Sequence, residues 1–184
     1  MKRKILIMML LLVMLASGCG KNNSENSGYV VKKSSDIVDV ILFESITTEG
    51  ESISSEIFNN SKITMINVWA TYCNPCLNEM PDLGEIAADY NETEFQVLGI
   101  VSDVSVKSSS NDIEYVNELI EETKADYPHL LLSESLYSNL VSNVDAVPTT
   151  FFVNQDGEIL KYVVGANSKN AWEKIIDELL EEIG

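Results

Sequence analysis

Apolar residues follow two distinct patterns along most of this chain. Residues 63–70 and 95–101 are nearly continuous apolar runs with many β-branched side chains, which is typical of strands buried on both faces. Residues 73–90 and 112–124 instead place apolar side chains three or four positions apart, which predicts helices with one buried face. The alternation of the two patterns indicates an α/β protein.

Shorter patterns complete the predicted fold. Residues 41–53 indicate a hairpin that turns at Gly50, and residues 147–164 indicate a second hairpin. A short strand is predicted at 130–132 and a short helix at 135–144. The last helix carries one apolar stripe, formed by Trp172, Ile175, Ile176, Leu179, Leu180 and Ile183. Together these elements predict a mixed sheet that helices cover on both faces.

The first nineteen residues have a different character from the rest. Three basic residues at positions 2–4 precede residues 5–16, which contain no polar side chain. This run is short for a transmembrane helix and has the length of a signal-peptide core. Small residues then precede Cys19, which resembles the bacterial lipobox, in which the cysteine is lipidated. An ordinary cleaved signal and an uncleaved anchor are the alternatives.

The segment after Cys19 is rich in Ser, Asn and Lys and lacks apolar periodicity, so it is predicted to be a flexible tether. The chain is therefore divided into a lipoprotein signal peptide at 1–18, a lipid-anchored tether at 19–36 and one folded domain at 37–184. This division predicts a protein anchored by lipid to the cell membrane and facing the extracytoplasmic side.

Charge and composition narrow the classes of function. The chain has 12 Lys+Arg against 29 Asp+Glu and a formal net charge of -17. Such an acidic surface repels phosphate backbones, so nucleic acid is not an expected partner. One histidine and three cysteines leave no redundancy for a four-ligand zinc site and exclude a disulfide-dense scaffold. We predict neither a metal site nor a cofactor.

Cys73 and Cys76 form a Cys-x-x-Cys motif where a predicted buried strand meets a predicted helix. The unpaired N–H groups at the helix start favour the thiolate of Cys73, which is the predicted nucleophile, and Cys76 is the resolving thiol one turn deeper. Three alternatives compete with a redox pair. Half a zinc ribbon would need a second cysteine pair, and a c-type haem site would need histidine where Leu77 stands. A structural disulfide that closes so short a loop would stabilise little.

Residues 67–81 (NVWATYCNPCLNEMP) resemble the active-site segment of thioredoxin-fold proteins of the TlpA/ResA type, and the strand after Val147 and Pro148 resembles their cis-proline strand. These proteins are membrane-tethered thiol–disulfide oxidoreductases. The likeness extends from about Phe43 to the C-terminus and implies a thioredoxin-like fold with a β-α insertion before the cis-proline. It also implies a cis Pro148, a Val147 peptide that binds a substrate segment by backbone hydrogen bonds, and Trp69 packed beside the sulfurs. A place for Trp69 as core filler is compatible with the same position.

One position departs from ordinary thioredoxins. Asn67 stands where they carry a buried aspartate, and an amide cannot take the proton that Cys76 must lose. Glu79 lies on the same helical face as Cys76 and matches the glutamate that serves this need in ResA-like proteins. Near the sulfurs a half-buried Glu79 should have a raised pKa. The alternative places Glu79 in solvent, and His129, which belongs to no motif, is expected in surface or loop packing.

The resemblance implies thiol–disulfide exchange. Residues 74 and 75 between the cysteines bring no cation that would strongly stabilise the thiolate, so we expect a reductant of client disulfides. The family suggests apocytochrome c or a methionine sulfoxide reductase as client, and a membrane thiol transporter resembling the CcdA/DsbD type as electron donor. A disulfide-forming oxidase and a non-enzymatic binding lipoprotein on the same scaffold are the two alternatives.

Overall fold

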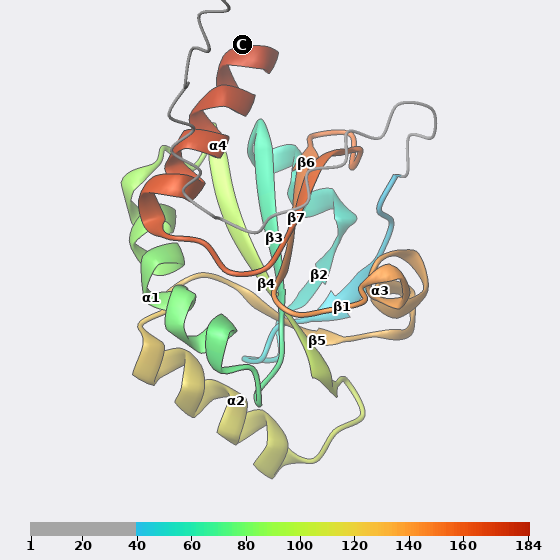
Figure 1. The fold of residues 1–184 in the computed structure, drawn as a ribbon. Coiled ribbons are helices and arrows are strands. Elements are labelled where there is room, and N and C mark those ends of the chain that lie inside the picture. The colour runs from blue at the N-terminus through green and yellow to red at the C-terminus, as the bar shows by residue number, and fades with distance from the viewer. Residues whose placement is uncertain (1–39) are drawn as a thin grey trace, which may run out of the picture.

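A five-stranded mixed sheet forms the centre of the protein (Figure 1). The computed structural model describes residues 40–184. The strand order is β5-β4-β3-β6-β7, with bounds β3 Ile63–Trp69, β4 Phe95–Ser105, β5 His129–Leu132, β6 Thr149–Asn154 and β7 Ile159–Val164. Strands β3, β4 and β5 run parallel, whereas β6 is antiparallel to β3 and β7 is antiparallel to β6. The predicted mixed sheet and its C-terminal hairpin are therefore confirmed.

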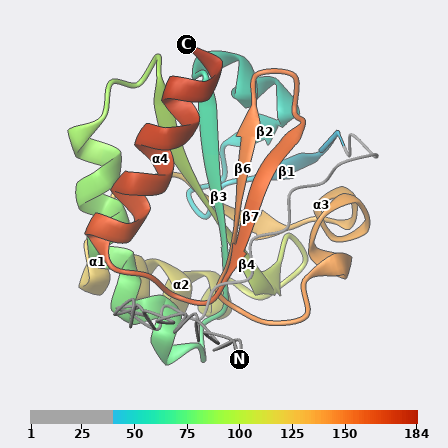
Figure 2. The same cartoon turned by 45° about the horizontal axis from the view of Figure 1, so that its top comes forward.

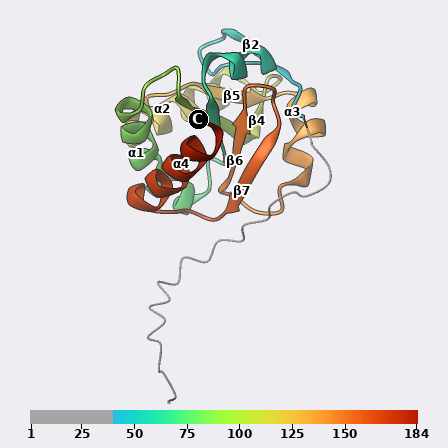
Figure 3. The ribbon, with the colours of Figure 1, turned by 90° about the horizontal axis from the view of Figure 1, so that it is seen from above.

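Helices cover both faces of this sheet (Figures 2 and 3). One face carries α1 (Asn74–Asp89), α2 (Ser110–Thr123) and α4 (Lys169–Ile183), and the other carries the short α3 (Glu134–Asn139). The pleat of β3 divides its side chains between the two cores. Met65 packs with residues of α1 and α4, whereas Ile66 packs with Leu136 of α3. The thioredoxin-like architecture follows the predicted arrangement.

The first hairpin forms a separate two-stranded sheet. It consists of β1 (Glu44–Ile46) and β2 (Ser52–Ser54), which pair antiparallel. Gly50 turns the chain with a φ of +92°, a conformation that favours glycine. A bridge between Thr47 and Leu130 attaches the hairpin to the edge strand β5. The hairpin was predicted, but the 3-10 helix η1 (Ser55–Asn60) that follows it was not.

Some element bounds differ from those the sequence predicts. β4 continues beyond residue 101 because a bulge between Val101 and Ser105 restores its pairing with β5. The helix predicted at 135–144 is divided into α3 and the 3-10 turn η2 (Val141–Asn143). Two strand–helix units, β4–α2 and β5–α3, lie between α1 and Pro148, in agreement with the predicted insertion.

The predicted signal peptide, the tether and Cys19 lie outside the described residues, so the divisions at 18 and 36 stay predictions. Within residues 40–184, no helix has both the length and the apolar character needed to cross a bilayer.

Candidate active site

The two cysteines of the motif are joined at the N-terminus of α1. Cys73 caps the helix, with its Sγ accepting from the backbone N–H of Cys76 at 3.2 Å, and Pro75 occupies the first turn. A disulfide links the two sulfurs, and the Cα atoms are 5.3 Å apart. Cys73 retains 6% exposure whereas Cys76 is fully buried. The motif therefore has the predicted geometry, with the outer sulfur at the helix start and the inner one shielded.

The loop that precedes Cys73 is fixed by the end of β4. Asp103 accepts from the backbone N–H of Thr71 at 3.1 Å and also from the Thr71 hydroxyl. The hydroxyl of Ser102 donates to the carbonyl of Trp69 at 2.8 Å. These contacts hold the sulfur-bearing turn against the sheet. The sequence contains no signal for them, because the partners lie more than thirty positions apart.

The second predicted motif lies just before β6. The Val147–Pro148 peptide bond is cis, as the resemblance implied. Val147 is half-buried and packs against the cluster that contains both cysteines, and Pro148 is buried. The carbonyl of Pro148 accepts from the backbone N–H of Gly165 at 2.8 Å, which ties this turn to the end of β7. The structure thus brings the Val147–Pro148 turn and the cysteine pair together, although they are far apart in sequence.

Glu79 belongs to α1, and its side chain is buried between this helix and the sheet. Its side chain is only 3% exposed. Oε1 accepts from Nδ2 of Asn67 at 3.0 Å, and Oε2 accepts from the backbone N–H of Asn167 at 3.0 Å. Burial raises the pKa of Glu79 from 4.5 to about 7, although these hydrogen bonds oppose the shift. The solvent-facing alternative is therefore wrong, and Glu79 is more buried than the half-buried position we predicted.

Two aromatic residues that the sequence analysis did not single out for this site lie around the Glu79 carboxyl. Trp172 of α4 weakly lowers the pKa of Glu79, although the geometry at its Nε1 falls short of a hydrogen bond. The pKa of Tyr127 is raised above its usual range, mainly by burial and further by the charge of Glu79. The hydroxyl of Tyr127 is buried without a hydrogen-bond partner among the described residues, as is Oδ1 of Asn67. Burial, and not a contact with these two aromatic groups, is therefore the main cause that favours the protonated form of the carboxyl.

His129 is in the core, so its predicted place in surface or loop packing is wrong. It begins β5, is 2% exposed, and accepts a hydrogen bond at Nδ1 from the indole Nε1 of Trp69 at 3.1 Å. Burial lowers the pKa of His129 to about 4. Space for the ring exists because its partner across the strands is Gly99, which has no side chain. Trp69 itself is fully buried in the same cluster as both cysteines, as predicted.

No cluster of three or more potential metal ligands occurs in the part of the chain that the structure describes. The chemistry that the arrangement supports is that of its own sulfurs and of the carboxyl buried on the same face of α1 as Cys76. A cysteine pair can exchange with another disulfide, and a carboxyl with a pKa near 7 can take up or release a proton at neutral pH.

Comparisons with known proteins agree with this chemistry. Residues 32–180 match the Redoxin family. The thiol-disulfide oxidoreductase ResA of Halalkalibacterium halodurans is 26% identical over 136 residues, which cover 73% of this chain and 69% of the relative.

Two solved structures show the same fold. A thiol:disulfide interchange protein of the thioredoxin family from Chlorobium tepidum TLS superposes with a TM-score of 0.65 at 21% identity, covering 79% of this chain and 98% of the other. An exposed lipoprotein thioredoxin from Streptococcus pneumoniae strain TIGR4 superposes with a TM-score of 0.57 at 24% identity, covering 74% and 98%. The family match spans most of the chain, and the relative is named for the reaction that a Cys73–Cys76 pair performs. The chain therefore belongs to the Redoxin family and is a thiol–disulfide oxidoreductase of the TlpA/ResA type.

Proposed function

We propose that this protein reduces disulfides in client proteins on the extracytoplasmic side of the cell membrane. The single observation that carries the proposal is the buried Glu79 carboxyl, which lies on the same face of α1 as Cys76 and has a pKa of about 7. A group of this kind can accept the proton of a buried thiol at neutral pH, which the resolving step requires.

The reaction transfers two electrons from the cysteine pair to the client. The Cys73 thiolate attacks one sulfur of the client disulfide, forms a mixed disulfide and releases the other client sulfur as a thiolate. Cys76 then passes its proton to Glu79 and attacks Sγ of Cys73. The Cys73–Cys76 disulfide forms, and the second client sulfur leaves as a thiolate that takes up a proton. The pair is oxidised and the client disulfide is reduced.

The turn around Pro148 is the proposed client-binding element. The backbone of Val147 would pair with an extended client segment by strand addition, with Trp69 completing the apolar surroundings of the sulfurs. Support comes from the packing of Val147 against the cluster of Trp69 and the two cysteines.

The direction of electron flow rests on what surrounds the outer sulfur. No histidine or other cation lies between the cysteines, so the Cys73 thiolate lacks the strong stabilisation that makes a disulfide oxidising. The proposed clients are apocytochrome c or a methionine sulfoxide reductase. The proposed donor is a membrane thiol transporter of the CcdA/DsbD type, which would return the pair to the dithiol form.

The proposed location depends on the N-terminal segment. The basic start, the apolar run and Cys19 predict a lipid anchor, and the similar solved structure from Streptococcus pneumoniae is described as an exposed lipoprotein thioredoxin. Cys19→Ala would remove the acylation site. The expected result is that the protein no longer fractionates with the membrane, and continued membrane association would contradict lipidation at this residue.

Trapping tests the reductant proposal. In a Cys76→Ser variant the mixed disulfide on Cys73 cannot be resolved, so clients should accumulate as covalent adducts that a reducing agent releases. The control is the double variant Cys73→Ser/Cys76→Ser, which cannot form them. Recovery of cytochrome c precursors or a sulfoxide reductase supports the proposed clients, and an absence of adducts contradicts them.

Equilibration of the wild-type Cys73–Cys76 pair in glutathione buffers measures its reduction potential, which gives the direction of electron flow. A reduction potential well below that of glutathione is expected. A value of about -120 mV, typical of strong oxidants, would favour the disulfide-forming alternative instead.

A further inference from the structure

Trp69 and His129 form a buried pair that links the redox site to the edge strand β5. The indole N–H of Trp69 donates to Nδ1 of His129 at 3.1 Å, and the two rings meet edge to face with centroids 5.6 Å apart. Trp69 is 0% and His129 2% exposed. Since Trp69 belongs to the cluster of Cys73 and Cys76, one hydrogen bond separates His129 from the environment of the sulfurs.

The imidazole is itself held from two further sides. Its Nε2 lies 3.1 Å from the carbonyl oxygen of Ala125, and the ring of Tyr127 stacks on it with centroids 4.4 Å apart. A carbonyl can only accept, so Nε2 carries the proton and Nδ1 is left as the acceptor. The contact with Ala125 therefore selects the tautomer that the Trp69 indole requires.

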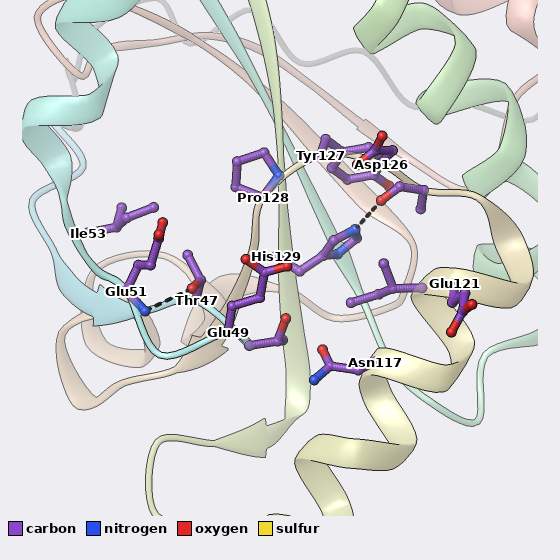
Figure 4. A pocket seen from close by; sticks show the side chains of 13 residues that line it. Thr47, Glu49, Glu51, Ile53, Asn117, Glu121, Asp126, Tyr127, Pro128 and His129 are labelled. Atoms are coloured by element: carbon purple, nitrogen blue, oxygen red, sulfur yellow. Dashed lines mark hydrogen bonds between the residues drawn. The ribbon is translucent and has the colours of Figure 1, made fainter.

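The ring of His129 packs closely against β4. A Cβ at Gly99 would lie 2.2 Å from Nδ1 of His129, so the ring fits at this position only because Gly99 has no side chain. His129 also borders a cavity of about 580 Å³ between the first hairpin, α2 and β5 (Figure 4). The ring itself is buried, and the hydrogen bonds at its two nitrogens fix its orientation.

We propose that His129 is a positioning residue for the thiol–disulfide reaction, which fixes the Trp69 indole against the Cys73–Cys76 pair by accepting its N–H. An indole N–H that stays buried without an acceptor lowers the stability of the folded protein. Without His129, the Trp69 indole therefore has to turn or admit water beside the sulfurs. The inference rests on the oxidoreductase activity of the pair and is independent of the direction of electron flow and of the client.

Two substitutions separate the two hydrogen bonds of the ring. His129→Asn keeps a side-chain oxygen near the position of Nδ1 and can still accept from Trp69. His129→Gln reaches toward the carbonyl of Ala125 but offers no acceptor at the δ position. Both replace the imidazole by an amide and lose the ring packing, and because asparagine is one methylene shorter than glutamine, a packing effect alone would be larger in His129→Asn. Thermal unfolding of each variant measures its packing loss.

Tryptophan labelled with ¹⁵N in the full-length protein, in detergent micelles, gives the direct measurement. The chain has two tryptophans, so Trp172→Phe assigns the two indole signals. In His129→Gln we expect the Trp69 indole proton to exchange with solvent at least tenfold faster, and the oxidation of the reduced pair by glutathione disulfide to slow at least threefold. In His129→Asn both should stay within twofold of the wild type. Unchanged values in His129→Gln, or equal losses in both variants, would overturn the proposal.

The wild-type protein provides a test that requires no variant. The chain has one histidine, so its two ring nitrogens give unambiguous ¹⁵N signals. A protonated Nε2 and an unprotonated Nδ1 at neutral pH are expected, and the opposite tautomer would overturn the proposal because Nδ1 could not accept. If these results hold while Cys76→Ser captures no client, the proposed client reduction fails and the role of His129 stands.

Discussion

Replacement of Glu79 by glutamine should remove a pH-dependent loss of stability that the wild type shows between about pH 4.5 and pH 7. The pKa of Glu79 is about 7 in the folded state against an ordinary 4.5, because the carboxyl is buried. The folded state therefore binds this proton more tightly than the unfolded state does. The free energy of unfolding falls as the pH rises from about 4.5 to about 7 and then levels off. At about 1.4 kcal/mol per pH unit between 4.5 and about 7, the loss amounts to about 3.5 kcal/mol.

Glutamine has nearly the same shape as glutamic acid and stays neutral, so Glu79→Gln should lack this loss. Urea unfolding of the oxidised protein at pH 5 and pH 8 measures the effect for the wild type and the variant. The two proteins differ only at residue 79, so the difference between their pH dependences isolates Glu79. Glu118→Gln, at an exposed position of α2, is the matched control and should follow the wild type. Equal pH dependence in Glu79→Gln and the wild type would refute a buried carboxyl with a raised pKa.

The same substitution should also slow the reaction. With no carboxylate to take the proton of Cys76, resolution of a mixed disulfide on Cys73 should slow by about 100-fold at pH 7, the lower end of the range for general bases. In the wild type the rate of this step should rise with pH around 7, and in the variant that rise should be absent. Stopped-flow measurement of product release gives both the rate at pH 7 and its dependence on pH. A stable variant with normal rates would leave Glu79 with a structural role only.

Four further substitutions test the packing and hydrogen bonds around the site by urea unfolding. Gly99→Ala should destabilise the protein by about 1–3 kcal/mol, because the new Cβ would lie 2.2 Å from Nδ1 of His129, and His129→Ala in the same chain should remove most of that clash. Tyr127→Phe removes a buried hydroxyl that lacks a partner among the described residues, and should stabilise by about 1 kcal/mol rather than destabilise. Asp103→Ala removes the acceptor for the N–H and hydroxyl of Thr71, and should destabilise by about 1 kcal/mol.

Local patterns were sufficient for the elements and for the outer part of the site. The apolar run at 63–69 forms the central strand, and the Cys-x-x-Cys motif lies at the start of α1 as its residue types require. The three-residue spacing between Cys76 and Glu79 also predicted that both lie on the same face of α1. These inferences depend only on neighbours within one or two turns, which is why a single sequence can support them.

The partners of those residues could not be predicted, because they depend on where distant segments meet. The N–H of Asn167 reaches Glu79 from the loop before α4, and the carboxylate of Asp103 reaches Thr71 from the extended end of β4. His129 has no motif around it, and its burial follows from the glycine that pairs with it on β4. Strand register and loop path decide these contacts, and neither leaves a periodic signal in the sequence.

A single row of the sheet connects the two buried polar contacts of the site. Cross-strand register aligns His129, Gly99, Asn67 and Thr150, from β5 through β4 and β3 to β6. On this row Asn67 donates both to Glu79 and to the hydroxyl of Thr150, and His129 accepts from Trp69. A one-residue slip between neighbouring strands would send one group of each pair to the opposite face, so the register specifies the partners of both Glu79 and Trp69. The buried polar contacts of Glu79 and Trp69 are thus fixed by the same hydrogen bonds that build the sheet.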